Sequence, residues 1–311
     1  MQAWMAGFTA KNSEANVQYS PDGSGAGREA FLGGGVQFAG SDAYLDDEEW
    51  KQAQKVCGPD GAMDIPVYVS PIAVAFHLEG INEINMDAET IAKVFRGEIT
   101  KWNDKAIASQ NEGVDLPDTA ITVVHRSDKS GTTENFVDYL AAAAGKVWTD
   151  EVSGDWPAEL KGENAQGTSG VVSTTSATNG AITYADASAV GDLGTVKVKV
   201  GNEYVAHSPE AAAQAVEVAT PVEGRGAVDM SLNLDRKTEK SGTYPIVLVS
   251  YHIYCSTYAD QNTVDLIKAF GSYVISEDGQ KTAQESAYNA PLSEALREKA
   301  QKAIDSISVK S

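Results

Sequence analysis

The stretch that decides the fold runs from residue 125 to residue 133 and reads His-Arg-Ser-Asp-Lys-Ser-Gly-Thr-Thr. It follows a mostly β-branched run at residues 121–124. It precedes a segment in which Phe136 and Leu140 fall four residues apart, the spacing of one helix face. The sequence therefore predicts a turn that leads from a strand into a helix.

This turn has the chemistry of an oxyanion site. The first N–H groups of a helix have no intrahelical partner, and the aligned peptide dipoles make that end partly positive. Ser130 and either Thr132 or Thr133 add hydroxyl donors. Gly131 allows a close backbone approach, and Arg126 adds a fixed cation. A simpler interpretation is equally open here: Ser130 or Thr132 only caps the helix, and Arg126 lies in solvent.

A second glycine-rich turn occupies residues 23–27, Gly23-Ser24-Gly25-Ala26-Gly27. We interpret it as a ligand loop, with a linker as the alternative, because linkers seldom separate two short ordered segments. A predicted strand at residues 36–42 then ends in Asp42, and ligands of open α/β sheets gather at the carboxyl ends of strands. Asp42 also fits an ordinary turn or cap residue.

Composition narrows the classes of protein. With 311 residues, 42% of them apolar, the chain has room for two domains with sizeable cores. Its formal net charge of −20 argues against a nucleic-acid partner. Any bound anion must therefore be held by local hydroxyl and N–H donors in a sheltered site. No run approaches the roughly 20 apolar residues of a membrane span, and the first residues lack the pattern of a signal segment.

The two cysteines, Cys57 and Cys255, lie far apart in the sequence. They fit buried thiols in an intracellular protein or a disulfide in an extracytoplasmic one. Neither the cysteines nor the scattered histidines have the spacing of a metal site, so we expect no metal and no cofactor.

Strands and helices alternate along the chain, which indicates α/β lobes with mixed or parallel sheets flanked by helices. Two long strands, at residues 65–76 and 245–255, are candidates to pass between two lobes. A short strand is predicted at residues 17–19. Helices are predicted at residues 1–11, 85–95, 209–217, 262–274, 279–285 and 293–304.

Four segments together resemble the PstS-like phosphate-binding receptor of ABC-type phosphate importers, and their order matches as well. They are residues 23–27, Phe-Ala-Gly-Ser-Asp at 38–42, Phe-Arg-Gly-Glu-Ile-Thr-Lys-Trp-Asn-Asp at 95–104, and residues 125–133. The last two segments together are highly specific. The resemblance implies a two-lobed fold of the type II periplasmic binding proteins, with the ligand cleft between the lobes. On this basis we assign residues 1–70 and 246–311 to lobe I and residues 71–245 to lobe II.

The resemblance also implies a set of phosphate ligands. Asp42 matches the carboxylate that accepts a hydrogen bond from a protonated phosphate oxygen, and Asp128 matches the carboxylate that holds the ligand arginine. Gly23, Gly25, Asp128 and Thr133 are supporting residues. The expected ligands are Ser24, Asp42, Arg126, Ser130, Gly131 and Thr132.

The chemistry of Asp42 predicts selectivity. A fixed carboxylate is satisfied only by an oxyanion that still carries a proton at neutral pH. Sulfate would present a lone pair to Asp42, at a cost on the order of 10³-fold in affinity. We therefore expect phosphate to bind more tightly than sulfate.

The chain departs from the resemblance at its start. Members of the family begin with a strand and a Ser- or Thr-containing loop before the helix matched by residues 1–11, and the loop contributes ligands. We expect lobe I to lack this strand and phosphate binding to be weakened.

The resemblance implies further properties. The partners are inorganic phosphate and the permease subunits of an ABC importer, and the receptor is an extracytoplasmic monomer, lipid-anchored in its precursor. Cys57 and Cys255 both fall in lobe I, which makes a disulfide between them an expectation. The alternative function is a phosphate-ester hydrolase that uses the turn at Ser130 and Thr132. It would need a base, and His125 is the nearby candidate.

Overall fold

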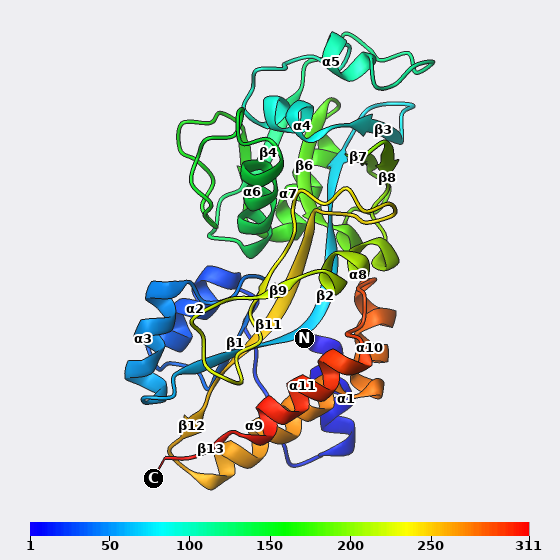
Figure 1. Cartoon of the computed structure of the whole chain (residues 1–311). Coiled ribbons are helices and arrows are strands. Elements are labelled where there is room, and N and C mark those ends of the chain that lie inside the picture. The colour runs from blue at the N-terminus through cyan, green and yellow to red at the C-terminus, as the bar shows by residue number, and fades with distance from the viewer. Residues whose placement is uncertain (311) are drawn as a thin grey trace. The chain divides into compact units, whose positions relative to one another are not determined.

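Two long strands, β2 (Ala62–Phe76) and β11 (Val247–Cys255), organise the computed structural model, which describes residues 1–310 (Figure 1). Both strands are buried along almost their whole length, as their largely apolar sequences predict. The chain forms two compact units, and both strands contribute residues to each. Unit 1 comprises Met1–Val69, Ala219–Asn233 and the chain from Val249 onward; unit 2 comprises Ser70–Val218 and Leu234–Leu248.

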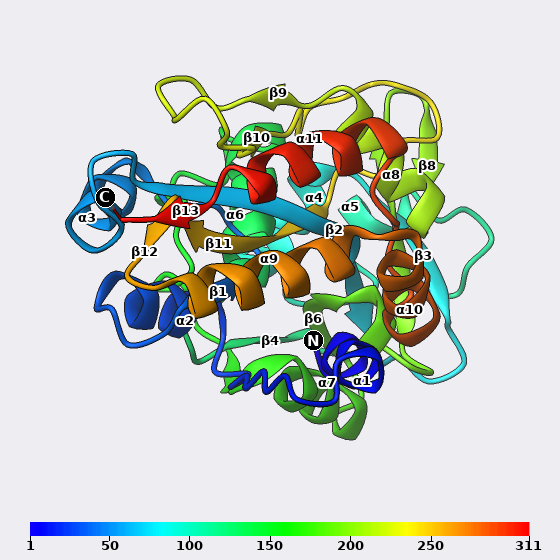
Figure 2. The same ribbon diagram turned by 90° about the horizontal axis from the view of Figure 1, so that it is seen from below.

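Unit 1 is built on β1 (Phe38–Ser41), which pairs antiparallel with β11 in the register Phe38↔Tyr254 and Ser41↔Tyr251. Helices α9 and α11 pack side by side, and α1 packs against α9 and α10 (Figure 2). The short strands β12 (Thr257–Tyr258) and β13 (Ser308–Val309) pair in parallel. The helices of this unit are α1 (Gln2–Lys11), α2 (Ser24–Leu32), α3 (Asp47–Cys57), α9 (Gln261–Ile275), α10 (Glu277–Ala287) and α11 (Glu294–Asp305).

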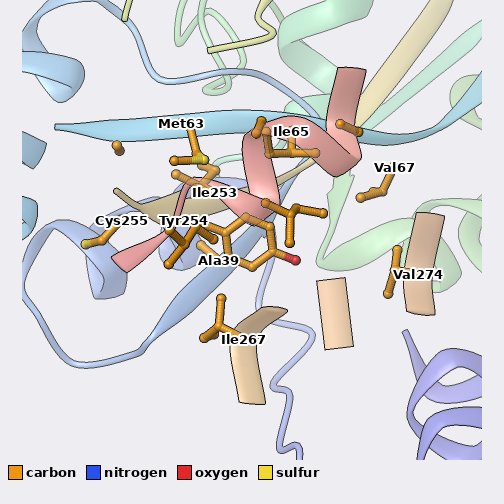
Figure 3. Close-up of a cluster of buried hydrophobic side chains, with 14 of the residues drawn as sticks. Ala39, Met63, Ile65, Val67, Ile253, Tyr254, Cys255, Ile267 and Val274 are labelled. Carbon is orange, nitrogen blue, oxygen red and sulfur yellow. The ribbon is translucent and has the colours of Figure 1, made fainter. Parts of the chain in front are cut away.

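The core of unit 1 lies between its strands and α9. Figure 3 shows Ala39 of β1, Ile65 of β2 and Ile253 of β11 beside Ile267 of α9. These side chains are 5% exposed or less, so each removes most of its apolar surface from water. β1, which ends just before the candidate ligand Asp42, therefore packs on a well-buried apolar core.

Unit 2 has a mixed sheet. β4 (Thr122–Arg126) runs parallel to β5 (Glu163–Ala165) and β6 (Ala181–Asp186), whereas β2 runs antiparallel to β6. β7 (Gly194–Val200) pairs parallel with β3 (Glu83–Met86) and antiparallel with β2 and β8 (Glu203–Val205). α7 packs against β4 and β6, and α4 packs against α6. The helices are α4 (Ala88–Phe95), α5 (Lys105–Ala108), α6 (Gly131–Ala143), α7 (Gly167–Ala177) and α8 (Pro209–Glu217), with a 3₁₀ turn η1 (Ala187–Ala189).

The α/β class with mixed sheets and flanking helices is confirmed. The predicted strand at residues 17–19 is wrong, because this segment has no strand pairing. Val17 instead lines a pocket of about 380 Å³ together with Gln37 and Phe38. Its extended, partly apolar sequence resembles a strand, but no ladder hydrogen bonds join it to β1 within residues 1–310.

Apart from shifts at residue 70 and residues 246–248, the division into units differs from the expected boundaries in one segment. Residues 219–233, expected in lobe II, belong to unit 1. This segment contains β9 (Thr220–Pro221) and β10 (Leu232–Asn233), which form a small antiparallel hairpin. It is held on unit 1 by polar contacts of Arg225 and Asp229, two residues that hydrophobic patterning does not register.

Cys57, at the end of α3, and Cys255, at the end of β11, form a disulfide within unit 1. It joins positions separated by 198 residues in the sequence. Among residues 1–310, no helix has both the length and the apolar character needed to cross a membrane.

Candidate functional site

The turn of unit 2 has the strand-to-helix form that its sequence predicts. β4 ends at Arg126 and α6 begins at Gly131. The side-chain oxygen of Ser130 accepts hydrogen bonds from the backbone N–H groups of Thr132 (3.2 Å) and Thr133 (3.4 Å) and so caps the helix. The capping interpretation is therefore correct for Ser130, but it does not use all the donors of the turn.

Arg126 is held by a two-point ion pair with Asp128. Its Nε donates to Oδ1 of Asp128 at 2.8 Å, and its Nη2 donates to Oδ2. The side chain is 8% exposed, and its Nη1 has no hydrogen-bond partner within residues 1–310. Arg126 is therefore not a solvated surface residue: it is a fixed fork whose Nη1 group is left for a ligand.

Asp128 is locked in turn by α7. Its Oδ1 also accepts the backbone N–H of Gly167 at 3.0 Å. Partial burial acts to raise the pKa of Asp128, but the hydrogen bonds from Arg126 and Gly167 outweigh it and hold the pKa below its usual value. Asp128 thus stays ionised and keeps Arg126 in one orientation.

Thr133 and Thr132 have different environments. The hydroxyl of Thr133 lies 2.7 Å from the hydroxyl of Tyr184, which also accepts the backbone N–H of Arg126 at 3.3 Å. Burial raises the pKa of Tyr184 to about 12, so this hydroxyl stays neutral. The hydroxyl of Thr132 and the backbone N–H of Gly131 have no hydrogen-bond partner within residues 1–310. Three donors of this turn thus remain available: Nη1 of Arg126, the hydroxyl of Thr132 and the N–H of Gly131.

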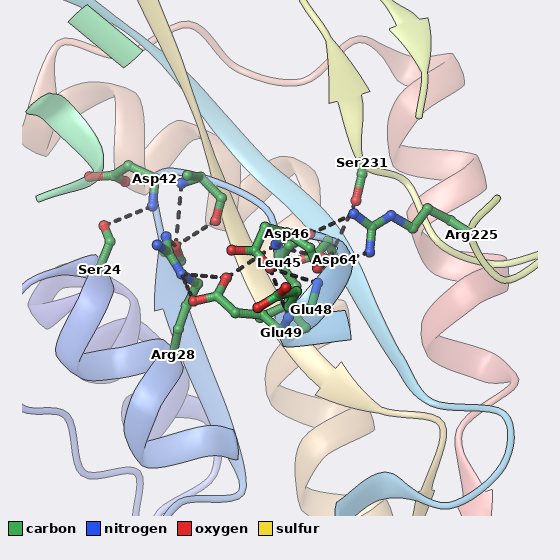
Figure 4. A network of polar contacts seen from close by, with 12 residues as sticks. Ser24, Arg28, Asp42, Leu45, Asp46, Glu48, Glu49, Asp64, Arg225 and Ser231 are labelled. Atoms are coloured by element: carbon green, nitrogen blue, oxygen red, sulfur yellow. Dashed lines mark hydrogen bonds and ion pairs between the residues drawn. The ribbon is translucent and has the colours of Figure 1, made fainter. Parts of the chain in front are cut away.

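The turn of unit 1 brings Ser24 and Asp42 together. Gly23 has φ +97°, a conformation that strains other residues, and it leads into α2 at Ser24. The side-chain oxygen of Ser24 accepts the backbone N–H of Asp42 at 3.0 Å (Figure 4). Gly27 keeps α2 close to β1, because a Cβ there would lie 3.0 Å from the carbonyl oxygen of Gly40. Gly25 is buried within α2.

Arg28 belongs to the same cluster, and sequence reasoning assigned it no role. Its side chain is 4% exposed. Its Nη1 donates to the hydroxyl of Ser41 at 3.1 Å, and its Nε pairs with the carboxylate of Glu49 at 3.1 Å. The available signal was a single arginine in a helix whose other residues, apart from Glu29, are small or apolar. Sequence reasoning also assigned no role to Tyr184, because the surrounding sequence indicates only that this residue lies in a strand.

The hydrolase alternative requires a base in contact with the nucleophile Ser130, and the described residues do not show this contact for His125. Nδ1 of His125 lies 2.9 Å from the carbonyl oxygen of Arg126, and its ring stacks on Trp156 with 5.1 Å between centroids. No hydrogen bond joins His125 to Ser130 in the described part of the chain. Within residues 1–310 no group of three or more His, Cys, Asp or Glu side chains could hold a metal ion.

Comparison with known proteins gives matches along most of the chain. The family model of the PBP superfamily domain matches residues 1–278. The phosphate-binding protein PstS 3 of Mycobacterium tuberculosis is 35% identical over 297 residues, which cover 94% of this chain and 79% of the relative. The phosphate-binding protein PstS of Xylella fastidiosa is 29% identical over 291 residues, covering 92% of this chain and 76% of the relative.

Solved structures show the same fold. A phosphate-binding protein from Stenotrophomonas maltophilia superposes with a TM-score of 0.70 at 20% identity, covering 90% of this chain and 85% of the other. An ABC-type phosphate transport receptor from Vibrio cholerae superposes with a TM-score of 0.60 at 16% identity, covering 94% and 95%. At such identities the likeness concerns the fold.

Proposed function

We propose that this chain, which belongs to the PstS family of phosphate-binding proteins, binds inorganic phosphate and delivers it to an ABC importer. The observation that carries the proposal is the turn between β4 and α6. There Asp128 accepts hydrogen bonds from Nε and Nη2 of Arg126 and leaves Nη1 for an anion. The N-terminus of α6, with the backbone N–H of Gly131, follows a few residues later in the sequence. Such an arrangement recognises a tetrahedral oxyanion.

The ligands in this proposal are the six residues expected from the sequence. Arg126, Ser130, Gly131 and Thr132 donate to phosphate oxygens, and Ser24 adds a contact from unit 1. Asp42 accepts the hydrogen bond of the protonated phosphate oxygen. With a formal net charge of −20 on the chain, these local donors must overcome a long-range repulsion of the anion. Binding should therefore depend on a few well-placed groups.

The proposal makes this protein a carrier without enzymatic activity. Its partner is a membrane permease, to which it presents phosphate as a monomer outside the cytoplasm, held there by a lipid anchor. The disulfide between Cys57 and Cys255 supports an oxidising compartment. The PstS relatives, named as phosphate-binding proteins, support the choice of ligand.

Isothermal titration calorimetry of the protein with phosphate and with sulfate tests the proposal. We expect saturable, stoichiometric phosphate binding, and sulfate binding weaker by about 10³-fold because sulfate cannot satisfy Asp42. Arg126→Gln removes the fixed cation and should weaken phosphate binding by about tenfold to a hundredfold. Absence of phosphate binding, or equal affinities for the two anions, would contradict the assignment.

A further inference from the structure

The loop that carries Asp42 is held from a distant part of the sequence. Residues 42–46 connect β1 to α3 and lie in neither element. The carbonyl of Leu45 instead accepts Nη2 of Arg225 at 2.7 Å, and the carbonyl of Asp46 accepts Nη1 at 3.4 Å (Figure 4). One guanidinium thus binds two successive carbonyls of this loop.

The side chain of Arg225 is itself buried and fixed by several contacts. Its side chain is 4% exposed and lies over the rings of Tyr44 and Trp50, with 5.8 and 5.6 Å to the ring centroids. Its Nη2 also pairs with Asp47 at 3.1 Å. The planar guanidinium combines stacking with several fixed hydrogen bonds, which a lysine cannot do.

Asp64, the third residue of β2, holds the same loop by accepting a hydrogen bond from the backbone N–H of a loop residue. Its carboxyl oxygens accept the backbone N–H of Leu45 at 3.3 and 3.4 Å, and one of them accepts the hydroxyl of Ser231 at 3.3 Å. Asp229 accepts the N–H of Asp64 at 2.9 Å. Leu45 is therefore fixed at its N–H by Asp64 and at its carbonyl by Arg225, while Ser24 fixes the N–H of Asp42.

We propose that Arg225, together with Asp64, is a positioning residue for phosphate selectivity, because it holds the loop that carries Asp42. The inference rests on the proposed function. Selectivity requires the Asp42 carboxylate to stay where only a protonated oxygen satisfies it. If the loop were free to move, the Asp42 carboxylate would turn away from the bound anion, and sulfate would no longer be rejected. Arg225 and Asp64 replace the ladder hydrogen bonds that the loop lacks.

The test compares Arg225→Ala and Arg225→Lys with Val264→Ala. Val264 is 2% exposed in the unit 1 core, on α9, so its variant loses stability without removing a polar contact of the loop. Phosphate and sulfate affinities are measured by calorimetry at a temperature where circular dichroism shows every variant folded. Hydrogen–deuterium exchange of residues 42–47 is followed without any anion.

We expect Arg225→Ala to weaken phosphate binding by about tenfold and to reduce the ratio of phosphate to sulfate affinity. The amide of Leu45 should exchange faster than in the parent. Arg225→Lys keeps the positive charge but loses the planar guanidinium, so its affinities and its exchange rate should lie between those of the parent and of Arg225→Ala. Val264→Ala should keep the affinities and the loop exchange of the parent.

Two outcomes overturn the inference. One is parent-like selectivity and parent-like loop exchange in Arg225→Ala; the other is an equal loss of affinity in Arg225→Ala and Val264→Ala, which would reduce Arg225 to a stability role. A parent protein that binds no phosphate overturns the proposed function itself. A parent protein that binds phosphate, together with either of the two outcomes above, overturns the positioning role alone.

Discussion

At the residue scale, the proposed ligand set combines donors with one acceptor. Arg126 is fixed by Asp128 with its Nη1 group left over, and Ser24 fixes the backbone of Asp42. Donors alone attract any oxyanion, whereas a carboxylate rejects those without a proton. If the proposed ligand set holds, affinity and selectivity are carried by different residues, and substitutions should separate them.

Asp42→Asn is the substitution that tests selectivity. An amide can donate to an unprotonated oxygen as well as accept from a protonated one, so sulfate is no longer penalised. We expect the ratio of phosphate to sulfate affinity to fall by at least tenfold, mostly through tighter sulfate binding. Competition calorimetry measures the ratio directly. A ratio unchanged from the parent would show that Asp42 does not face the ligand.

A second residue-scale prediction concerns Asp64. Its burial, followed by the nearby charge of Asp229, raises its pKa well above the ordinary value of an aspartate. The folded protein therefore keeps this proton to higher pH than the unfolded chain does. Stability from this group is complete below the unfolded pKa near 4 and is lost as pH rises toward the folded pKa.

Asp64→Asn removes this dependence and keeps an acceptor for the N–H of Leu45. The free energy of unfolding of the variant, relative to that of the parent, should increase as pH rises above about 4, by up to roughly 1.4 kcal/mol per pH unit. Urea unfolding from pH 4 to 8 measures the difference, with the exposed Asp115 changed to Asn as control. A constant difference across this range would contradict a raised pKa.

At the element scale, α6 begins at a residue with two roles. Ser130 caps the helix, and we propose that it also contacts phosphate. Ser130→Asp separates the roles, because aspartate caps helices about as well as serine but repels a nearby anion. The helix should remain intact while the site loses its ligand.

We expect Ser130→Asp to change the free energy of unfolding by less than about 1 kcal/mol and to weaken phosphate binding by at least a hundredfold. Ser293→Asp, at the cap of α11 in unit 1, is the matched control and should leave binding unchanged. Thermal unfolding and calorimetry give the two quantities. Strong phosphate binding by Ser130→Asp would exclude Ser130 from the ligand set.

At the scale of the whole molecule, the disulfide constrains one of the two units. Cys57 and Cys255 close a loop that includes all of unit 2, yet both lie in unit 1. Removing such a link restores conformational entropy to the unfolded chain. The effect should therefore appear as a loss of unit 1 stability.

The variant that replaces both cysteines by serine should lose about 2–5 kcal/mol of stability in unit 1. Hydrogen exchange at increasing temperature can follow each unit separately. We expect peptides of unit 1 to open at lower temperature and those from residues 70–218 to remain protected. Equal loss in both units would indicate that they unfold together.

The sequence predicted most of the elements and several of the local site contacts, because the relevant residues lie in short contiguous stretches. Ser130 caps the helix that follows it, and Arg126 pairs with a carboxylate two residues away. Arg225 could not be found in this way, since it contacts Leu45 across 180 residues. The expected strand at residues 17–19 was wrong because strand pairing depends on a partner that the local sequence does not specify.

By itself, the sequence determined the α/β class, the strand-to-helix turn at residues 125–133, the glycine turn that opens the helix at Ser24, and the acidic character that requires local donors for an anion. These properties follow from hydrophobic periodicity, glycine and helix-cap chemistry and charge, which act over a few residues. Only the tertiary structure decided that residues 219–233 pack on unit 1 and that Arg225 and Asp64 fix the loop of Asp42. The physical reason is that a buried polar side chain must find its partners wherever the fold brings them, and their distance in sequence places no limit on that choice.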